Sequence, residues 1–466
     1  MKDEGANLPG SFRDPSGFLF VREGILYRQI NAPYRPHYDH LMGGGLYAAL
    51  TEAGLLVPHT EVDTPPADPA APYKVIKPER VPFVSYPYEW CFGQLKAAAL
   101  ATLRIQKKAA EFGMVLKDAS AFNMQFVDGK PVLIDTLSFE KLDGWTPWIA
   151  YRQFCQHFLA PLLLIALKDF RLAQLSRIFI DGVPLDLAGR LLPKATRFRP
   201  GVATHIHAHA WSQRHFAKKP VQVRKRPTSR AAFLGLIDSL EALVRKTEFR
   251  LKKTEWGGYY EETNYSDRAF EHKKAIIESY LDAVRPRDVW DLGANTGVFS
   301  RLASRRGIPT VAFDLDFVAV ELNYRECLAN KETRLLPLVL DLTNPSPALG
   351  WAHEERASLA GRGPADTVLA LALLHHLAIS NNLPFEKIAA FFRTTCRSLI
   401  IEFVPKNDSQ VQRLLATRED IFTGYTPARF EEAFGRWFRI RKAEKISDSE
   451  RTLYLMDAPD AALRVI

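Results

Sequence analysis

Five short apolar runs in the second half of the chain limit most strongly how it can fold. Each run has the length of a β-strand, and a helix-compatible stretch separates it from the next. The runs are Asp288–Leu292, Thr310–Phe313, Leu335–Leu340, Thr367–Leu373 and Ser398–Phe403. Strands that alternate with helices predict an α/β domain with a doubly wound, mostly parallel sheet, which binds its ligands at the carboxyl ends of the strands.

The composition is that of an ordinary globular protein. The chain has 466 residues, of which 47% are hydrophobic and 25% charged, and this excludes a disordered or fibrous protein. The net charge of +9 is too mild for this length to assign a nucleic-acid partner. Four scattered cysteines predict neither disulfides nor a cysteine zinc site, which fits a cytoplasmic location. The longest apolar run, Phe158–Leu167, is too short to span a membrane, so we expect a buried helix there.

A basic segment divides the chain into two predicted domains. Residues 217–230 carry six basic residues, two prolines and no acid, a composition that disfavours packed structure. We therefore expect an α+β domain over 1–216, a basic linker over 217–233 and the α/β domain over 234–466.

A glycine-containing turn follows the first predicted strand of the second domain. In VWDLGANTGVFSRLA, the residues Asp291, Gly293, Asn295 and Gly297 form a D-x-G-x-N-x-G pattern that leads into a helix. Glycine lets the backbone approach a bulky ligand, and asparagine tolerates a positive φ. The order of strand, turn and helix predicts a ligand site, although the pattern differs from the dinucleotide-binding G-x-G-x-x-G.

Acidic residues end the next two predicted strands. Asp314 follows Gly297 by seventeen residues, where a carboxylate can accept hydrogen bonds from a ribose diol, and Asp316 is the near alternative. Asp341 ends the third strand, from which it can reach an adenine amino group. A solvated strand end explains any one of these acids alone, but their joint order and spacing favour a nucleoside site.

This arrangement resembles the class I S-adenosylmethionine-dependent methyltransferases over roughly residues 256–457. The resemblance implies a Rossmann-like fold, S-adenosylmethionine as the cofactor, and a methyl acceptor that the sequence does not identify. It implies these positions: Asp291, Gly293, Asn295 and Gly297 around the methionine part, Asp314 at the ribose and Asp341 by the adenine. Methyl transfer is an in-line displacement, so the enzyme must align donor and acceptor and supply a base where the acceptor loses a proton.

Two histidines, His375 and His376, end the fourth predicted strand, where members of this family commonly present acceptor-contacting residues. The ordinary pKa of histidine suits proton abstraction near neutral pH, so either is a candidate general base. Alternatively, one of the pair caps the following helix or packs beneath it. The Asn-Pro-Pro-Tyr type motif of amine-methylating enzymes is absent here, which disfavours an amine acceptor without excluding it.

Two flanking segments complete the prediction for this domain. The segment ERTLYLMD predicts a final antiparallel edge strand. Four aromatic residues precede the first strand, where they would either form a lid over the ligand or pack in the core. They are Trp256, Tyr259, Tyr260 and Tyr265.

The first domain carries a second group of polar residues. Asp118 and Asn123 are five residues apart, and Asp135 follows twelve residues later, after a hairpin turn predicted at Asp128-Gly129. This spacing resembles the catalytic segment of protein-kinase-like and aminoglycoside-phosphotransferase-like folds. The resemblance implies that Asp118 is the base, and that Asn123 and Asp135 hold Mg²⁺ with ATP.

The match to the kinase-like family is partial. Lys117 replaces the histidine or arginine that precedes the first aspartate, and D-T-L replaces D-F-G at Asp135. No glycine-rich loop precedes them, and Lys74, Lys77 and Arg28 all remain candidates for the phosphate-pairing cation. We expect a kinase-like domain with a reduced N-lobe, either active or retained to bind a nucleotide or substrate.

Four histidines in this domain suggest a metal site by their number. Their spacing of two residues is awkward on a helix, so we expect a surface helix or a loop instead. They are His205, His207, His209 and His215.

The leading hypothesis is a methyltransferase fused to a kinase-like domain, with a glycan or small-molecule hydroxyl as the acceptor. This fusion resembles, in reverse order, the bifunctional enzymes that cap bacterial O-antigen polysaccharides. The alternatives are a bifunctional kinase-methyltransferase, an RNA methyltransferase that uses the basic linker, and a scaffold without chemistry. The leading hypothesis requires neither nucleic acid nor a membrane span.

Overall fold

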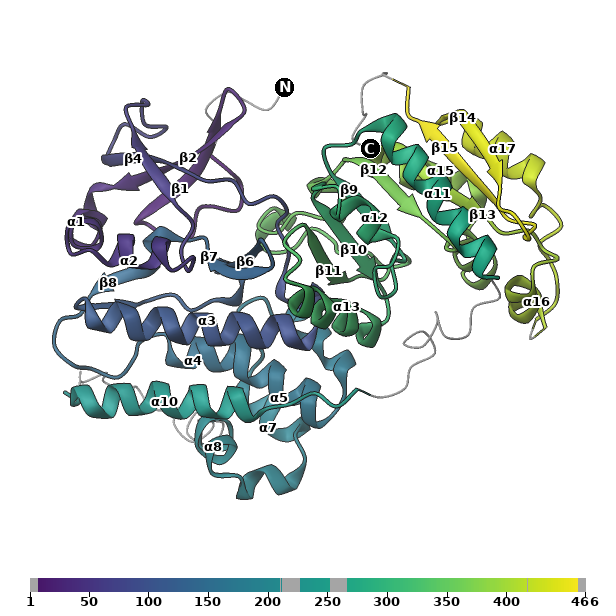
Figure 1. The fold of residues 1–466 in the computed structure, drawn as a ribbon. Helices are drawn as coiled ribbons and strands as arrows, with labels where there is room; N and C mark the ends of the chain where they lie inside the picture. Colours follow the sequence, from purple (N-terminus) through teal and green to yellow (C-terminus); the bar gives the residue numbers. More distant parts are fainter. Residues whose placement is uncertain (1–6, 210, 212–226, 252–265, 417, 460–466) are drawn as a thin grey trace. The chain divides into compact units, whose positions relative to one another are not determined.

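The computed structural model describes residues 7–209, 211, 227–251, 266–416 and 418–459 (Figure 1). The chain divides into two compact units. Unit 1 comprises Met1–Leu251 and Gly350–Glu355, and unit 2 comprises Lys252–Leu349 and Arg356–Ile466. Among the described residues, no helix combines the length and the apolar character needed to cross a membrane.

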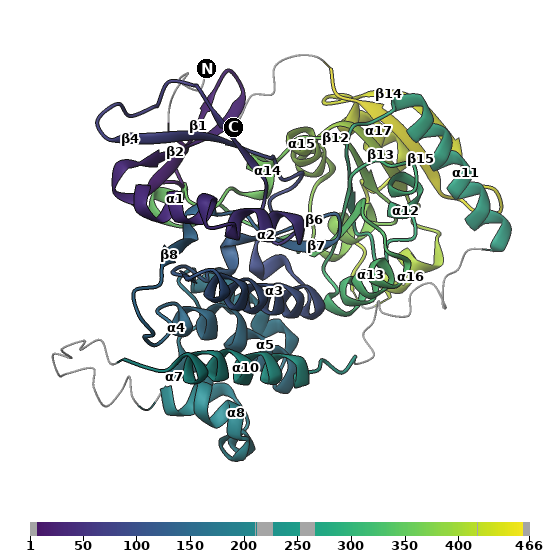
Figure 2. The ribbon, with the colours of Figure 1, turned by 60° about the vertical axis from the view of Figure 1, so that its left-hand side comes forward.

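Unit 1 begins with a small antiparallel sheet and two short helices (Figure 2). The sheet has the order β1-β2-β4-β3. Its elements are β1 (Gly17–Arg22), β2 (Ile25–Asn31), α1 (Arg35–Gly43), α2 (Leu46–Glu52), β3 (His59–Val62) and β4 (Pro72–Pro78). Phe20 and Ile30 are fully buried on this sheet.

The rest of unit 1 is mainly helical, which confirms the predicted α+β class. Its α-helices of four or more residues, within the described part of the chain, are α3 (Phe92–Glu111), α4 (Tyr151–Phe154), α5 (Ala160–Leu167), α6 (Leu175–Ile178), α7 (Leu185–Leu191) and α10 (Arg230–Lys246). Its short strands are β5 (Met114–Leu116), β6 (Met124–Val127), β7 (Lys130–Leu133) and β8 (Phe139–Lys141). The predicted turn at Asp128-Gly129 is confirmed, since Val127 pairs with Lys130 across it.

Helix α10 corrects the predicted domain boundary. It lies alongside α3 in unit 1 (Figure 1), where Lys107 contacts both Asp238 and Glu241 through its ammonium group. The boundary therefore moves from residue 234 to Lys252, because the apolar face of α10 packs in the first core. Residues 230–233 of the predicted linker are the first turn of this helix, and residues 217–226 lie outside the described part of the chain.

Unit 2 contains a seven-stranded sheet in the order β11-β10-β9-β12-β13-β15-β14. The strands are β9 (Val289–Leu292), β10 (Thr310–Asp314), β11 (Leu335–Val339), β12 (Ala365–Ala370), β13 (Cys396–Phe403), β14 (Arg439–Lys445) and β15 (Thr452–Asp457). The first five are parallel to one another, which confirms the predicted α/β sheet.

The predicted position of the last strand is wrong. β15 is antiparallel to β13, but it lies inside the sheet, and β14 forms the edge. Leu453 and Leu455 of β15 are fully buried, as an interior strand requires. β14 is rich in exposed charged residues, which suit an edge because they discourage further strand pairing.

Helices cover both faces of this sheet. Ile277 of α11 (Asp267–Val284) packs in one core with Ile400 of β13. Phe403 points to the opposite face, because side chains alternate along a strand, and there its ring contacts Phe385 of α15 (Phe385–Thr395) and Phe430 of α17 (Pro427–Gly435). The other described α-helices of four or more residues in this unit are α12 (Ser300–Ser304), α13 (Phe317–Asn330), α14 (Leu359–Arg362) and α16 (Ser409–Leu415).

Candidate functional site

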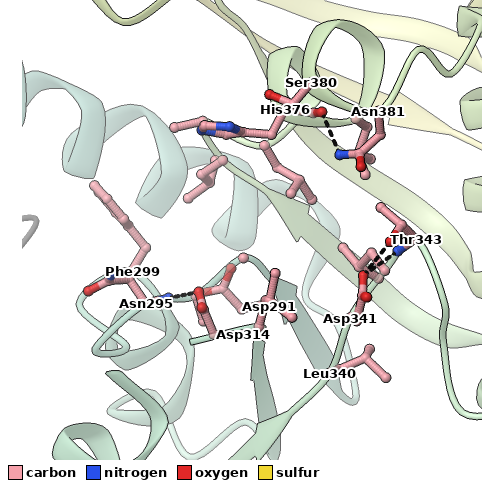
Figure 3. Close-up of a pocket in the computed structure, with 18 of the residues that line it drawn as sticks. Asp291, Asn295, Phe299, Asp314, Leu340, Asp341, Thr343, His376, Ser380 and Asn381 are labelled. Atoms are coloured by element: carbon pink, nitrogen blue, oxygen red, sulfur yellow. Dashed lines mark hydrogen bonds between the residues drawn. The ribbon is translucent and has the colours of Figure 1, made fainter. Parts of the chain in front are cut away.

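A cavity of about 390 Å³ lies at the carboxyl ends of the parallel strands of unit 2 (Figure 3). Its walls come from the turn after β9, the ends of β10 and β11, the segment after β12, and helix α11. Six residues predicted from the sequence line it. They are Asp291, Gly293, Asn295, Asp314, Asp341 and His376.

Asp314 and Asn295 are joined directly at the cavity. The backbone N–H of Asn295, which has a φ of 50°, donates to Asp314 Oδ2 at 2.7 Å (Figure 3). The N–H of Asp316 donates to Asp314 Oδ1 at 2.8 Å. Burial nevertheless raises the pKa of Asp314 to about 6. Asp316, the alternative ribose residue, instead caps α13 by accepting from Val318 N.

Asp291 is buried deeper in the same wall. Its side chain is 1% exposed, and Oδ2 accepts a hydrogen bond from Ser300 Oγ at 2.6 Å. Burial, with a smaller contribution from the nearby Asp314 carboxylate, raises the pKa of Asp291 to about 7, and the hydrogen bond from Ser300 opposes this shift. The bond to Ser300 fixes α12 to the end of β9.

The two glycines of the turn have different surroundings. Gly293 lines the cavity with a φ of +82°, and a Cβ there would lie 3.3 Å from Leu373 Cδ1. Gly297 has a φ of +80°, but it is not among the lining residues of this cavity. A Cβ at residue 297 would lie 2.5 Å from Nδ2 of Asn323. Gly297 therefore allows the turn to pack closely against α13, whereas Gly293 borders the cavity.

Asp341 follows β11 on the cavity wall. Its Oδ1 accepts from the backbone N–H of Thr343 at 2.8 Å and from Thr343 Oγ1 at 2.6 Å (Figure 3). Leu340 and Leu342 line the cavity beside it. This part of the wall thus combines one carboxylate with apolar surface.

The structure separates the two candidate histidines. His376 lines the cavity and begins a π-helical turn, His376–Ser380. Burial, with a smaller contribution from Arg451, lowers its pKa to about 4. His375 is 2% exposed, and its Nδ1 has no hydrogen-bond partner within the described chain. The geometry of His375 matches the alternative in which one histidine packs beneath the helix.

Sequence reasoning missed Lys273, which also lines the cavity. Its ammonium group donates to Glu402 Oε2 at 2.7 Å, and both side chains are at most 2% exposed. Burial lowers the pKa of Lys273, and the Glu402 carboxylate opposes this shift. The available signal was helical spacing, because Lys273 lies four residues from both Ala269 and Ile277 on the apolar face of α11.

In unit 1, hydrogen bonds bring the predicted Asp118, Asn123 and Asp135 into one group. Asn123 Nδ2 donates to Asp118 Oδ2 at 3.0 Å and lies 3.4 Å from Ser138 Oγ, which donates to Asp135 Oδ2 at 2.6 Å. Asp135 also forms an ion pair with Arg28. Of the three candidate cations, Arg28 is therefore the one shown beside Asp135. No cluster of three or more His, Cys, Asp or Glu residues suited to a metal occurs in the described chain.

The histidine-rich segment of unit 1 is structural where it is described. His205 is 1% exposed, and its ring nitrogens bond Tyr151 Oη at 2.7 Å and Ser239 Oγ at 2.9 Å. The predicted surface role is therefore wrong for His205, which links α4 to α10. His215 and the predicted aromatic lid (Trp256, Tyr259, Tyr260 and Tyr265) lie outside the described residues.

Comparison with known proteins gives one relative over nearly the whole chain. No protein-family model matches. The nodulation protein NoeA of Rhizobium meliloti (strain 1021) is 33% identical over 463 residues, which cover 97% of this chain and 96% of that protein.

Solved structures similar to part of the chain include methyltransferases. Magnesium protoporphyrin IX methyltransferase from Synechocystis PCC 6803 with bound SAH is 18% identical, with a TM-score of 0.30, and the match covers 43% of this chain and 90% of that one. The bifunctional kinase-methyltransferase WbdD is 16% identical, with a TM-score of 0.29 and coverage of 41% and 40%.

Proposed function

This chain belongs to the same family as the nodulation protein NoeA, and we propose that it transfers a methyl group from S-adenosylmethionine in the cavity of unit 2. The observation that carries the proposal is the joined pair of Asn295 and Asp314 at the carboxyl ends of β9 and β10. The predicted turn and the predicted ribose carboxylate are distant in sequence, yet they meet on one cavity wall.

The cavity suits this cofactor in size and in chemistry. Its volume of about 390 Å³ lies in the ordinary range for small-molecule sites. The oxygens of Asp314 accept the backbone N–H groups of Asn295 and Asp316, and because a carboxylate offers about four acceptor positions it can also accept hydrogen bonds from a ribose diol. Gly293 leaves the turn without a side chain where the methionine part would lie, and Leu340 with Asp341 suits an adenine ring.

His376 is the proposed proton acceptor. When bound, S-adenosylmethionine supplies an electrophilic methyl group, and the protein must align a nucleophile with it. Because burial lowers the pKa of His376 to about 4, its ring is neutral near pH 7 and has one nitrogen that can accept a proton, but the same shift makes it a weaker base than an ordinary histidine. His376 would take the hydroxyl proton of the acceptor as the new C–O bond forms and the bond between the methyl carbon and the sulfonium sulfur breaks, which would release S-adenosylhomocysteine.

We propose a hydroxyl of a glycan or small molecule as the acceptor. Ser380 and Asn381 add polar groups to the cavity beyond His376. The residues that follow Asn381 line a second cavity of about 270 Å³. The lining of this cavity combines the aromatic rings of Phe385 and Tyr425 with the charged Arg429. Such a mixture of aromatic and polar groups suits a hydroxylated ring.

The kinase-like identity of unit 1 stays a proposal. Its small antiparallel sheet, the long helix α3 and the β6–β7 hairpin beside Asn123 and Asp135 support it. The ion pair between Arg28 and Asp135 favours a unit that holds a substrate or nucleotide over one that transfers phosphate, because Mg²⁺ would have to compete with a fixed cation.

Calorimetric titration of the full chain with S-adenosylmethionine tests the main proposal. We expect binding by the wild type and at least tenfold weaker binding by Asp314→Asn, because one acceptor oxygen becomes a donor. Asp288→Asn is the matched control, since Asp288 precedes β9 at the opposite end of the strands and should leave affinity unchanged. Failure of the wild type to bind would refute the proposal, and equal losses in the two variants would refute the site.

A second titration on the same sample, with ATP and Mg²⁺, addresses unit 1. Mg²⁺-dependent binding that disappears in Asp135→Ala would support a nucleotide site there. Binding of S-adenosylmethionine without any ATP response would favour a unit that holds the methyl acceptor.

A further inference from the structure

The segment after β12 contains a residue in a conformation that alanine rarely adopts. Ala372 has a φ of 49°, and its neighbours Leu371 and Leu373 line the same cavity as Ala372 itself. The left-handed region disfavours a residue with a Cβ by roughly 5- to 30-fold in population. Such a conformation persists only where the surrounding structure enforces it.

A buried carboxylate holds this residue in place. Glu402, near the end of β13, is fully buried, and its Oε2 accepts the backbone N–H of Ala372 at 2.8 Å. The same oxygen accepts from Lys273 Nζ at 2.7 Å. A hydrogen bond to an ionised carboxylate is stronger than one between neutral groups, so Glu402 is well suited to enforce the turn.

Further charged residues fix the carboxylate itself. Arg451 Nη1 lies 3.5 Å from Glu402 Oε1, and its Nε and Nη2 bond both oxygens of Asp408 at 2.7 and 3.0 Å. Asp408 caps α16, the helix that contributes Leu414 to the cavity wall. The buried group therefore joins α11, β13, the start of β15 and α16. Buried ion pairs contribute little net stability compared with apolar replacements, so stability alone does not explain this group.

We propose that Glu402 is a positioning residue that holds Ala372 in the left-handed conformation and thereby fixes the cavity wall for methyl transfer. The inference rests on the function proposed above. Leu373 faces the glycine turn, as the short distance from its Cδ1 to a Cβ on Gly293 shows. The carbonyl oxygen of Leu373 accepts from His376 N at 3.0 Å, so the turn also sets where His376 begins its helix.

Two double variants separate the hydrogen bond from the charge. Lys273→Met/Glu402→Gln keeps an amide oxygen that can accept from Ala372, whereas Lys273→Met/Glu402→Met has none. Both variants avoid an unpaired buried ammonium group, and both retain the pair of Arg451 with Asp408. We expect the methionine variant to bind S-adenosylmethionine about tenfold more weakly than the glutamine variant in calorimetric titrations of the full chain.

Glycine should rescue the weakened variant at one position only. Adding Ala372→Gly to the methionine variant removes the penalty on positive φ and should restore affinity to within about threefold of the glutamine variant. Lys331→Gly is the matched control, because Lys331 has a φ of 55° at the C-terminus of α13 and is not a lining residue of the cavity. It should leave the affinity unrestored.

The outcomes distinguish this inference from the proposed function. If the wild type binds the cofactor but the glutamine and methionine variants bind equally well, the positioning role is refuted. Rescue of the unfolding temperature without rescue of affinity would also refute it. Absence of binding by the wild type would instead refute the proposed function. If the double variants fail to fold, Ala372→Asn and Ala372→Val provide the test, because asparagine tolerates a positive φ and valine does not. The asparagine variant should bind S-adenosylmethionine at least tenfold more tightly than the valine variant, and equal affinities would refute the positioning role.

Discussion

Replacing Gly297 by alanine should destabilise unit 2 without any direct loss of a cavity contact. The residue has a φ of +80°, a conformation that costs an alanine about 1–2 kcal/mol. The new Cβ would also lie 2.5, 2.7 and 2.8 Å from the side-chain Nδ2, Oδ1 and Cγ atoms of Asn323, which is 1% exposed. Overpacking of this kind costs about 1–3 kcal/mol, so we expect a total loss of about 2–5 kcal/mol in the free energy of unfolding.

Urea unfolding monitored by circular dichroism measures this loss. The urea concentration at the midpoint should fall, while the slope of the unfolding free energy against urea concentration should stay unchanged. Gly307→Ala is the matched control, because Gly307 has the same φ of +80° but no atom within 4 Å of the position that a Cβ would take. It should lose about 1–2 kcal/mol from the backbone alone. Adding Asn323→Ala to Gly297→Ala should relieve the overpacking, as a double-mutant cycle would show. Equal losses at residues 297 and 307 would refute the reasoning.

Three further predictions concern charged and polar groups. Burial raises the pKa of Asp291 to about 7, so between about pH 4 and pH 7 the folded chain keeps a proton on this group that the unfolded chain has lost. The contribution of Asp291 to stability should therefore fall as the pH rises from about 4 to 7. The free energy of unfolding, measured with urea, should therefore fall more between pH 5 and pH 8 in the wild type than in Asp291→Asn. The opposite difference would contradict the assigned pKa shift. Ser300→Ala removes the hydrogen bond to Asp291 and should cost about 1–3 kcal/mol of unfolding free energy, whereas Ser380→Ala, at an exposed serine, should cost little. Arg28→Met should strengthen Mg²⁺-dependent ATP binding in calorimetry if the ion pair with Asp135 is what opposes the metal, and Lys74→Met, which breaks an exposed pair with Glu61, should have no such effect.

Local patterns allowed the main features of the candidate site to be predicted. Asp291 and Asp314 lie near the carboxyl ends of strands whose apolar runs are visible in the sequence, Asn295 lies in the turn after one of them, and parallel strands bring their carboxyl ends to one edge. The prediction therefore needed only the order of strands and turns. The role of Gly297 was not accessible in this way, because it depends on Asn323 in another helix.

Long-range pairing explains what the sequence did not reveal. Lys273 and Glu402 are 129 residues apart, and a lysine on an apolar helix face does not identify its partner. The edge of the sheet was misassigned because the charged segment Arg439–Lys445 does not alternate as a half-buried strand would. The continuous apolar core of Thr452–Asp457 indicates burial on both faces, and this is the signal for an interior strand that the prediction overlooked.

The electrostatic setting of the two polar groups explains why we place the chemistry in unit 2. Asp135 in unit 1 already pairs with Arg28, so a cationic ligand there gains little new attraction. Asp314 in unit 2 forms no ion pair within the described chain, and burial raises its pKa to about 6, so its ionised form would be stabilised by a ligand that supplies compensating groups. A ligand that donates hydroxyl hydrogen bonds to Asp314 and brings a positive charge to the same cavity would supply this compensation. S-adenosylmethionine combines a ribose diol with a sulfonium cation. The cavity wall formed by Asp291 and Asp314 is suited to bind a ligand that carries both groups.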